Sequence, residues 1–312
     1  MRAIDSLQSR LKAGEVIIMD GGTGSELHRR GLPVSDKIWS GEALFSQPDA
    51  IREIHEDYIK AGAEIVITNT FSTGRHILEV AGLGDRTVEI IKLGVKLARE
   101  ARDKAATGKP VIIAGSMSGY SPLLDPTVTP SYETALTDYR EQSKALAEGG
   151  VDLIVVEMLI RTLDARAAAE AAAETGLPVW IGYSVVEDKG KLYLGLRRKH
   201  INESIRYAVE AISSAGVSAF FIMHSSLEIT APGLRELRQC TDVPIGAYAH
   251  TISHYLGPLP RDMAWRDLSP EGYLGYARGW VRDGGQIIGG CCGTTPEHIR
   301  ALKTGLPDRI EA

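Results

Sequence analysis

The chain is poor in cysteine, with three in 312 residues, and it has no basic block and no stripe of Lys and Arg interleaved with aromatic residues. Three cysteines give no disulfide framework in a chain of this length, so we expect a reducing, cytoplasmic location. A net charge of −5 argues against nucleic acid or an anionic membrane as a partner. The first residues lack the apolar core of a signal peptide, and no apolar run approaches the length of a membrane span.

One unit repeats along the chain: a short apolar or β-branched run that ends in a polar residue or glycine, followed by a helical pattern. Eight such runs occur, at residues 16–19, 65–68, 111–114, 153–156, 179–183, 219–223, 245–249 and 286–290. Continuous apolar runs are typical of strands buried on both faces of a parallel sheet. Eight βα units in a length somewhat above the roughly 250 residues of a plain barrel predict an α/β fold, a single (β/α)8 TIM barrel that forms one domain over residues 1–312.

An open, doubly wound sheet is the alternative architecture. After the first run, residues 20–25 are rich in glycine but have neither Gly-x-Gly-x-x-Gly spacing nor a P-loop lysine, which favours the barrel. The extra length lies in three segments, 24–44, 117–131 and 251–271. All three follow strands, so we expect them on the catalytic face.

In a barrel, the residues at the carboxyl ends of the strands converge on one pocket. This rule gathers a set of polar residues that follow the eight runs: Asp20, Asn69, Ser116, Glu157, Ser184, His224, His250, Cys291 and Cys292. Aromatic residues are scarce, at 6%, but several stand in strand-end segments and are candidate walls of a cation–π pocket: Trp39, Phe71, Tyr120, Tyr183 and Tyr248.

Cys291 and Cys292 are adjacent, in a glycine-rich segment between an apolar run and a helix start. Thiolates are strong ligands for soft metals, and adjacent cysteines do not easily form an unstrained disulfide. Two small buried residues that close a strand are the alternative interpretation. Barrel closure places strands six and eight two places apart, so His224 can meet the pair in a Cys2His zinc site with an open fourth position, as in catalytic zinc centres. His250 is a second candidate ligand or a substrate contact, and Cys240, at a helix end on the opposite side, is interpreted as structural.

Several motifs together resemble the homocysteine S-methyltransferase family, the zinc-dependent barrels that act on betaine or S-methylmethionine. They are residues 19–27 (Met-Asp-Gly-Gly-Thr-Gly-Ser-Glu-Leu), 38–40, 68–71, 149–152 with Glu157, and 289–299, which begins Gly-Gly-Cys-Cys-Gly-Thr. The likeness covers nearly the whole chain in order, and the last motif is the most specific.

The resemblance implies an enzyme that moves a methyl group from an onium donor to the zinc-bound thiolate of homocysteine or a related thiol, with no nucleophile from the protein. It implies catalytic roles for Asp20 and Glu157, which anchor the amino group of homocysteine or the cationic donor. The metal ligands are then His224, Cys291 and Cys292, and zinc is the cofactor. The remaining pocket residues would bind substrate: Gly22, Thr23, Trp39, Asn69, Ser116, Tyr120, Ser184, Tyr248 and His250. The expected partners are a small-molecule thiol and an onium methyl donor, and a homo-oligomer is compatible with the sequence.

Three segments depart from the family pattern, and all belong to the predicted pocket. His224 stands where the family has the cysteine of an Asn-Cys pair, residues 115–120 differ from Gly-Ser-x-Gly-Pro-Tyr, and residues 248–250 differ from Tyr-Pro-Asn. A Cys2His zinc is formally neutral, whereas a three-thiolate zinc is an anion, so a thiol bound here would be more acidic and less nucleophilic. A zinc hydrolase or lyase that activates water, and a non-catalytic barrel that binds a thiol or a metal, are the competing functions.

Overall fold

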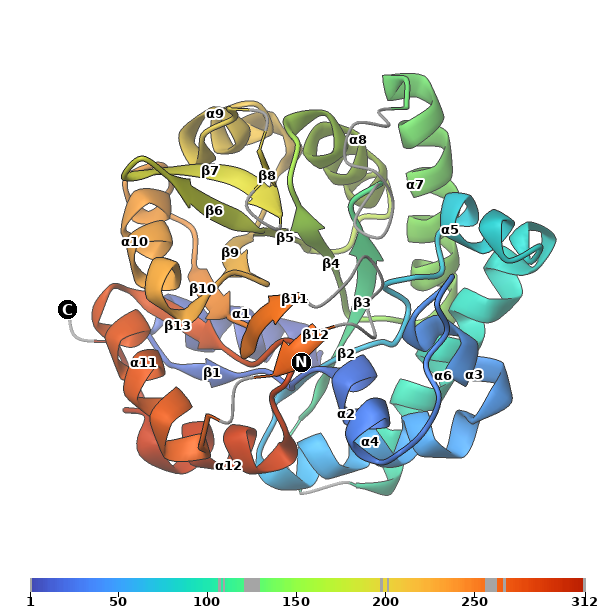
Figure 1. Ribbon diagram of the computed structural model, residues 1–312, viewed down its shortest axis with the longest axis horizontal. Coiled ribbons are helices and arrows are strands. Elements are labelled where there is room, and N and C mark those ends of the chain that lie inside the picture. Colours follow the sequence, from blue (N-terminus) through green and yellow to red (C-terminus); the bar gives the residue numbers. More distant parts are fainter. Residues whose placement is uncertain are drawn as a thin grey trace.

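Eight parallel strands close into a barrel around the centre of the molecule, with helices on the outside (Figure 1). The computed structural model describes residues 2–105, 108, 110–120, 130–196, 199–200, 202–255, 263–265 and 268–310. The barrel strands are β1 (Ile17–Ile18), β2 (Ile65–Ile67), β3 (Ile112–Ser118), β4 (Leu153–Leu159), β5 (Val179–Tyr183), β9 (Ala219–Met223), β10 (Ile245–Tyr248) and β13 (Gly285–Ile288). Each falls on one of the eight predicted runs, which confirms the (β/α)8 barrel.

The barrel closes between the first two strands. Met19 bridges Ile65 in parallel register, and the Glu64 N–H donates to the Ile18 carbonyl at 2.8 Å. The order around the barrel is β1-β13-β10-β9-β5-β4-β3-β2. Only β10 therefore separates β9 from β13, which places the segments that follow these two strands side by side.

One outer helix follows each barrel strand. These helices are α4 (Pro48–Ala61), α6 (Thr87–Lys104), α7 (Tyr132–Gly149), α8 (Thr162–Ala173), α9 (Ile205–Glu210), α10 (Leu227–Arg238), α11 (Pro270–Arg282) and α12 (Pro296–Gly305). As the apolar spacing predicts, α4 buries Ile51, Ile54 and Tyr58, and it ends at Gly62 in the left-handed region, with φ 111°. The alanine-rich α8 buries most of its small side chains, because they let the helix lie close to the sheet.

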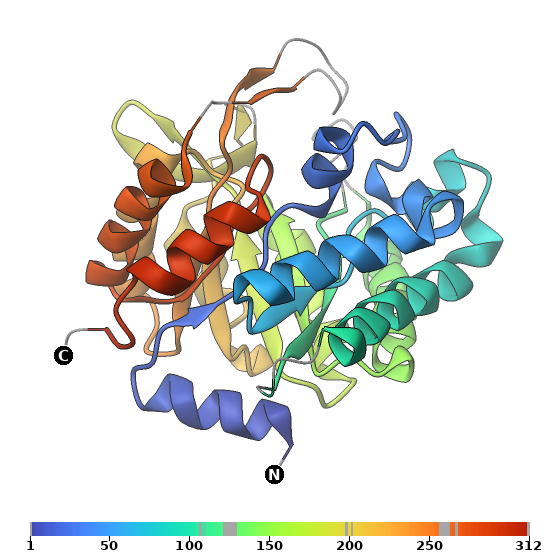
Figure 2. The same ribbon diagram turned by 90° about the horizontal axis from the view of Figure 1, so that it is seen from below.

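Side chains that point inward form a core separate from the layer between strands and helices. Trp180 of β5 belongs to the inner cluster and its neighbour Ile181 to the outer one, as the alternation of a strand requires. Helix α1 (Ala3–Lys12) closes the lower end of the barrel with Leu7 and Leu11, and Figure 2 shows it beneath the strands. Sequence reasoning did not identify this helix.

Several shorter elements lie beyond the carboxyl ends of the strands. The segment 24–44 holds most of α2 (Thr23–Arg29), η1 (Ser40–Glu42) and the start of α3 (Ala43–Ser46), and the segment 251–271 holds the hairpin of β11 (Ile252–Tyr255) and β12 (Met263–Trp265). Residues 121–129 of the third predicted segment lie outside the described residues. A fourth insertion, absent from the prediction, forms the small sheet of β6 (Val185–Asp188), β7 (Lys191–Leu196) and β8 (Lys199–His200).

The remaining short helices are α5 (Arg75–Val80), η2 (Gly84–Arg86) and η3 (Ser213–Ala215). Within the described part of the chain, no helix combines the length and the apolar character that a membrane crossing requires.

His55 is fully buried in α4, and neither of its ring nitrogens has a hydrogen-bond partner among the described residues. Burial opposes the charged form of the imidazole and lowers the pKa of His55 to about 4. The folded protein therefore binds fewer protons than the unfolded chain between about pH 6.5 and pH 4. The free energy of unfolding is reduced as the pH falls through this window.

We expect His55→Leu to lose less stability on acidification than the parent protein, because leucine has no proton to bind. Between pH 7 and pH 5, His55 contributes about 2 kcal/mol to the decrease in the free energy of unfolding. Urea unfolding at both pH values measures the difference, with His28→Leu as the control because His28 is exposed on α2. The same acid loss in His55→Leu and the parent would contradict this account.

Candidate metal centre

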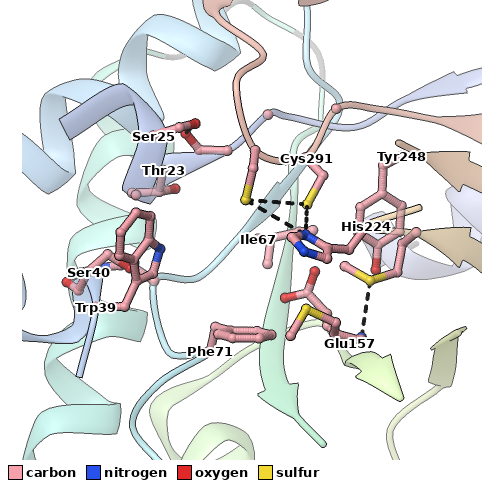
Figure 3. A pocket seen from close by; sticks show the side chains of 18 of the residues that line it. Thr23, Ser25, Trp39, Ser40, Ile67, Phe71, Glu157, His224, Tyr248 and Cys291 are labelled. Atoms are coloured by element: carbon pink, nitrogen blue, oxygen red, sulfur yellow. Dashed lines mark hydrogen bonds between the residues drawn. The ribbon is translucent and has the colours of Figure 1, made fainter. Parts of the chain in front are cut away.

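His224, Cys291 and Cys292 meet at the carboxyl end of the barrel (Figure 3). His224 directly follows β9, and Cys291 and Cys292 are the third and fourth residues after β13. The Nδ1 atom of His224 lies 3.4 Å from Sγ of Cys291 and 3.8 Å from Sγ of Cys292, and the two sulfurs are 3.9 Å apart. The predicted convergence of strands six and eight is therefore confirmed.

The three donor atoms fit a tetrahedral metal ion. Ligand distances of about 2.0–2.3 Å and tetrahedral angles require donor atoms to stand roughly 3.3–3.8 Å from one another. The observed separations of 3.4, 3.8 and 3.9 Å match one triangular face of such a tetrahedron within about 0.3 Å. Among the described residues, no other group of His, Cys, Asp and Glu side chains has this arrangement.

The cysteine segment is fixed by hydrogen bonds to neighbouring strand ends. The Gly290 N–H donates to the Asp20 carbonyl at 2.9 Å, and the Cys291 N–H donates to the Ala249 carbonyl at 3.0 Å. The segment also needs a glycine, since a Cβ at Gly290 would lie 2.2 Å from Oγ1 of Thr294. Because residue 290 has no side chain, the backbone can pass close to Thr294, and both cysteine sulfurs can turn toward the barrel mouth.

His224 adopts a backbone conformation that is rare for a residue with a side chain, with φ 44°. Its N–H donates to the Tyr248 carbonyl at 3.2 Å, and its carbonyl accepts from the Ser184 hydroxyl at 3.3 Å. These bonds hold the residue in the left-handed region, where strain is often found at functional sites.

The two thiols titrate as a pair. The Cys291 thiol donates toward Sγ of Cys292, and this contact, together with His224, holds the pKa of Cys292 well below its usual range. The same contact and burial raise the pKa of Cys291 well above its usual range. One thiolate and one thiol are thus favoured, and a cation bound to both sulfurs would displace the remaining proton.

A cavity of about 890 Å³, counting its opening to solvent, adjoins the sulfurs. Figure 3 shows Trp39 and Phe71 across this space from His224 and Cys291. Its apolar walls are Trp39, Ile67, Phe71, Met158, Leu196, Met223 and the ring of Tyr248. Gly22, Thr23 and Asn69 also line it, as the sequence predicts for substrate-binding residues.

Glu157 is the acidic side chain in the cavity wall, at the carboxyl end of β4. Its Oε2 accepts a hydrogen bond from the Ser116 hydroxyl. Burial raises the pKa of Glu157 to about 7, against the opposing effect of the Ser116 hydroxyl and the Tyr248 phenol. A cation in the cavity would favour the ionised carboxylate, so the site is suited to a positively charged ligand.

Other predicted site residues lie behind the cavity wall. The Oδ2 atom of Asp20 accepts a hydrogen bond from the Ile67 N–H at 2.9 Å, which connects the end of β1 to β2. The Oδ1 atom of Asp20 has no hydrogen-bond partner among the described residues. Burial raises the pKa of Asp20 well above its usual range. Ser116 contacts Glu157, and Ser184 contacts the His224 backbone.

Two of the predicted aromatic walls are placed elsewhere. Tyr120 stacks on His76 with ring centroids 4.0 Å apart, and Tyr183 stacks on Phe220 in the outer core. Neither residue lines the cavity, because both rings pack in or against the layer between strands and helices, Tyr120 on His76 of α5.

Sequence reasoning missed the apolar residues that shape the cavity. Met158 and Met223 lie at strand ends, where only polar and aromatic residues were considered, and the Met158 N–H points to the Met223 sulfur at 3.1 Å. Leu196 belongs to β7, in the insertion that was not predicted. Their positions at the carboxyl ends of strands would have identified both methionines as residues of the cavity wall.

The fold and the site define a (β/α)8 barrel in which a His-Cys-Cys cluster with the spacing of metal ligands borders a small-molecule pocket. Residues 17–306 match the sequence model of the family described as homocysteine S-methyltransferase, and the chain belongs to that family. The resemblance seen in the motifs is thereby confirmed, and this is an enzyme of a family that transfers methyl groups to thiols of the homocysteine type.

Curated relatives and solved structures agree with this assignment. Homocysteine S-methyltransferase 3 of Zea mays is 28% identical, over 94% of this chain and 91% of the relative. Selenocysteine methyltransferase of Astragalus bisulcatus is 26% identical, over 93% and 92%. The crystal structure of the homocysteine methyltransferase MmuM from Escherichia coli in its metallated form superposes with a TM-score of 0.79 at 26% identity, over 97% of this chain and 99% of that one.

The glycine before the cysteine pair provides a test of the site geometry. We expect Gly290→Ala to weaken metal binding by about 10–100-fold, because the new Cβ displaces Thr294 or the segment that carries both sulfurs. Competition with a chromophoric chelator measures the affinity. Gly275→Ala in α11 is the matched control, since a Cβ there meets no atom within 4 Å. Equal affinity in Gly290→Ala and the control would show that the segment tolerates the side chain.

Proposed function

We propose that this protein is a zinc-dependent methyltransferase that moves a methyl group from an onium donor, similar to S-methylmethionine or a betaine, to the thiolate of homocysteine or a related thiol. The observation that carries the proposal is the triangle of His224, Cys291 and Cys292 at the wall of a cavity that also contains Glu157. Two thiolates and an imidazole form a donor set that favours zinc over harder cations.

Zinc, when bound, lowers the pKa of a coordinated thiol so that the thiolate is present at neutral pH. The residues of the chain hold the other reactant. Trp39 and Phe71 lie across the cavity from the sulfurs, where their ring faces can contact an onium methyl group. The Glu157 carboxylate offsets the positive charge of the donor or of the acceptor's amino group.

The transfer needs no nucleophile from the protein. The acceptor sulfur forms the new bond to carbon while the bond from that carbon to the donor's sulfur or nitrogen breaks, and the electron pair stays on the donor atom. The donor thereby loses its positive charge and leaves as a neutral thioether or amine. An apolar wall suits this step, because it excludes water and holds donor and acceptor in line.

The cysteines provide the first test. We expect Cys291→Ala and Cys292→Ala to lose zinc, with affinity reduced by more than about 100-fold, and to lose methyl transfer. The fold should persist, since the barrel has its own core. Cys240→Ala is the control, because Cys240 donates to the Glu236 carbonyl within α10 and its turn and lies outside the site.

Zinc analysis and transfer of a labelled methyl group to a panel of thiols measure these outcomes, with S-methylmethionine, betaines and S-adenosylmethionine as donors. Full zinc and full activity in the cysteine variants would contradict the assigned site. Zinc binding by the parent protein without transfer from any donor would contradict the methyltransferase function and favour a site that activates water.

Glu157 provides the second test. We expect Glu157→Gln to keep zinc but to lower kcat/KM for the cationic substrate by about 10–100-fold, because a buried interaction between charges becomes a neutral one. An uncharged thioether analogue of the donor serves as the control and should bind the parent and the variant equally. KM values for donor and acceptor identify which cation the carboxylate contacts. Unchanged values for both would exclude this role.

A further inference from the structure

The end of β10 forms hydrogen bonds both to the segment that carries His224 and to the segment that carries the two cysteines. The Tyr248 carbonyl accepts the His224 N–H at 3.2 Å, and the Ala249 carbonyl accepts the Cys291 N–H at 3.0 Å. The next two residues, His250 and Thr251, donate hydrogen bonds, again one to each of these two segments. The His250 N–H bonds to the Ser225 carbonyl at 3.3 Å, and the Thr251 N–H bonds to the Cys292 carbonyl at 2.9 Å.

Residues 248–251 therefore form a backbone bridge between the segment that carries His224 and the segment that carries the cysteines. Four hydrogen bonds, two to each side, fix the distance between the two segments. They do not fix the direction of the His224 ring, which can still rotate about its last side-chain bond.

The orientation of that ring decides whether the site has its third ligand. Nδ1 of His224 is the atom that faces both sulfurs, at 3.4 and 3.8 Å. A half-turn of the ring would exchange Nδ1 with the carbon Cδ2, which cannot bind a metal. With the ring turned in that way, only the two cysteine sulfurs would remain as ligands, even though the backbone had not moved.

The side chain of His250 packs against this ring. The two imidazoles meet edge to face, with centroids 4.7 Å apart and planes at 77°. His250 itself lies outside the group of donor atoms that stand within 4.8 Å of one another. It contacts the ligand and does not belong to the ligand triangle.

We propose that His250 is a positioning residue that holds the His224 imidazole with Nδ1 toward the two cysteine sulfurs. The role rests on the metal site of the proposed function, but it concerns the orientation of the ring and not the reaction. Ring packing of this kind contributes through shape and contact area, so an aromatic ring of similar size at position 250 preserves it.

The test compares two replacements of His250 in two backgrounds. His250→Ala removes the ring, and His250→Phe keeps a ring without nitrogens. Each is made in the parent protein and together with His224→Cys, whose sulfur has no ring to orient. Zinc affinity by chelator competition and the visible ligand-field spectrum of the Co²⁺-loaded protein are measured for all variants, and circular dichroism monitors folding.

We expect His250→Ala to lower zinc affinity by about 10–100-fold and to alter the Co²⁺ spectrum. His250→Phe should restore the affinity to within a few-fold of the parent protein. In the His224→Cys background, His250→Ala should have no effect on affinity, because the pair that the interaction requires is absent.

Three results would overturn the proposal. If His250→Ala binds zinc as tightly as the parent protein, His250 does not position the ring. If His250→Phe loses as much zinc affinity as His250→Ala, a nitrogen atom of His250 is required and not the ring as such. An equal loss in the His224→Cys background shows that His250 supports the site as a whole. Failure of the parent protein to bind zinc contradicts the proposed function itself and is thereby distinguished from these results.

Discussion

The site depends on the closure of the barrel between β1 and β2. The bridge between Met19 and Ile65 joins the two edges of the sheet, and the pairing of β10 with both β9 and β13 places these three strands next to one another. Residues 67 positions apart in the sequence, His224 and Cys291, thereby come within 3.4 Å. An open sheet would leave two unpaired edges and would not force the carboxyl ends of all eight strands to face one pocket.

A divalent ion bound to His224, Cys291 and Cys292, as in the proposed function, would differ in charge from one held by three thiolates. With two thiolates and a neutral imidazole, such an ion is formally neutral, so a thiol bound to it would lose its proton readily but keep less electron density for attack. In the proposed reaction a cationic donor would compensate, because an onium methyl group is a reactive electrophile. Glu157, in the cavity wall, would add in its ionised form the negative charge that such a centre lacks.

Two of the departures from the family pattern prove to be neighbours in space. His224 and His250 follow different strands, yet their rings are in contact at 4.7 Å. The hydrogen bonds from residues 248–251 connect the segment of His224 with the segment of the two cysteines. The cluster thus spans three neighbouring strand ends, with His224 and the cysteines on the outer two and residues 248–251 between them.

The glycine-rich loop after β1 illustrates how backbone approach constrains the pocket. A Cβ at Gly24 would lie 2.2 Å from Nε1 of Trp39, so the indole can lie directly on the helix only because this position is glycine. Trp39 itself adopts φ 47°, in the left-handed region. The aromatic wall opposite the sulfurs therefore depends on one glycine and one strained residue.

The sequence by itself determined the barrel and the convergence of His224 with Cys291 and Cys292. Eight apolar runs specify buried parallel strands through their continuous hydrophobicity, and chain order then specifies which strand ends carry His224 and the cysteines. Only the tertiary structure decided which strand-end residues face the cavity. Asp20 turns to the Ile67 N–H and Tyr120 stacks on His76, because hydrogen-bond partners and packing neighbours come from distant segments. Leu196 reaches the cavity from the inserted sheet of β6, β7 and β8, and the contact between His224 and His250 depends on how two loops pack, which no local pattern encodes.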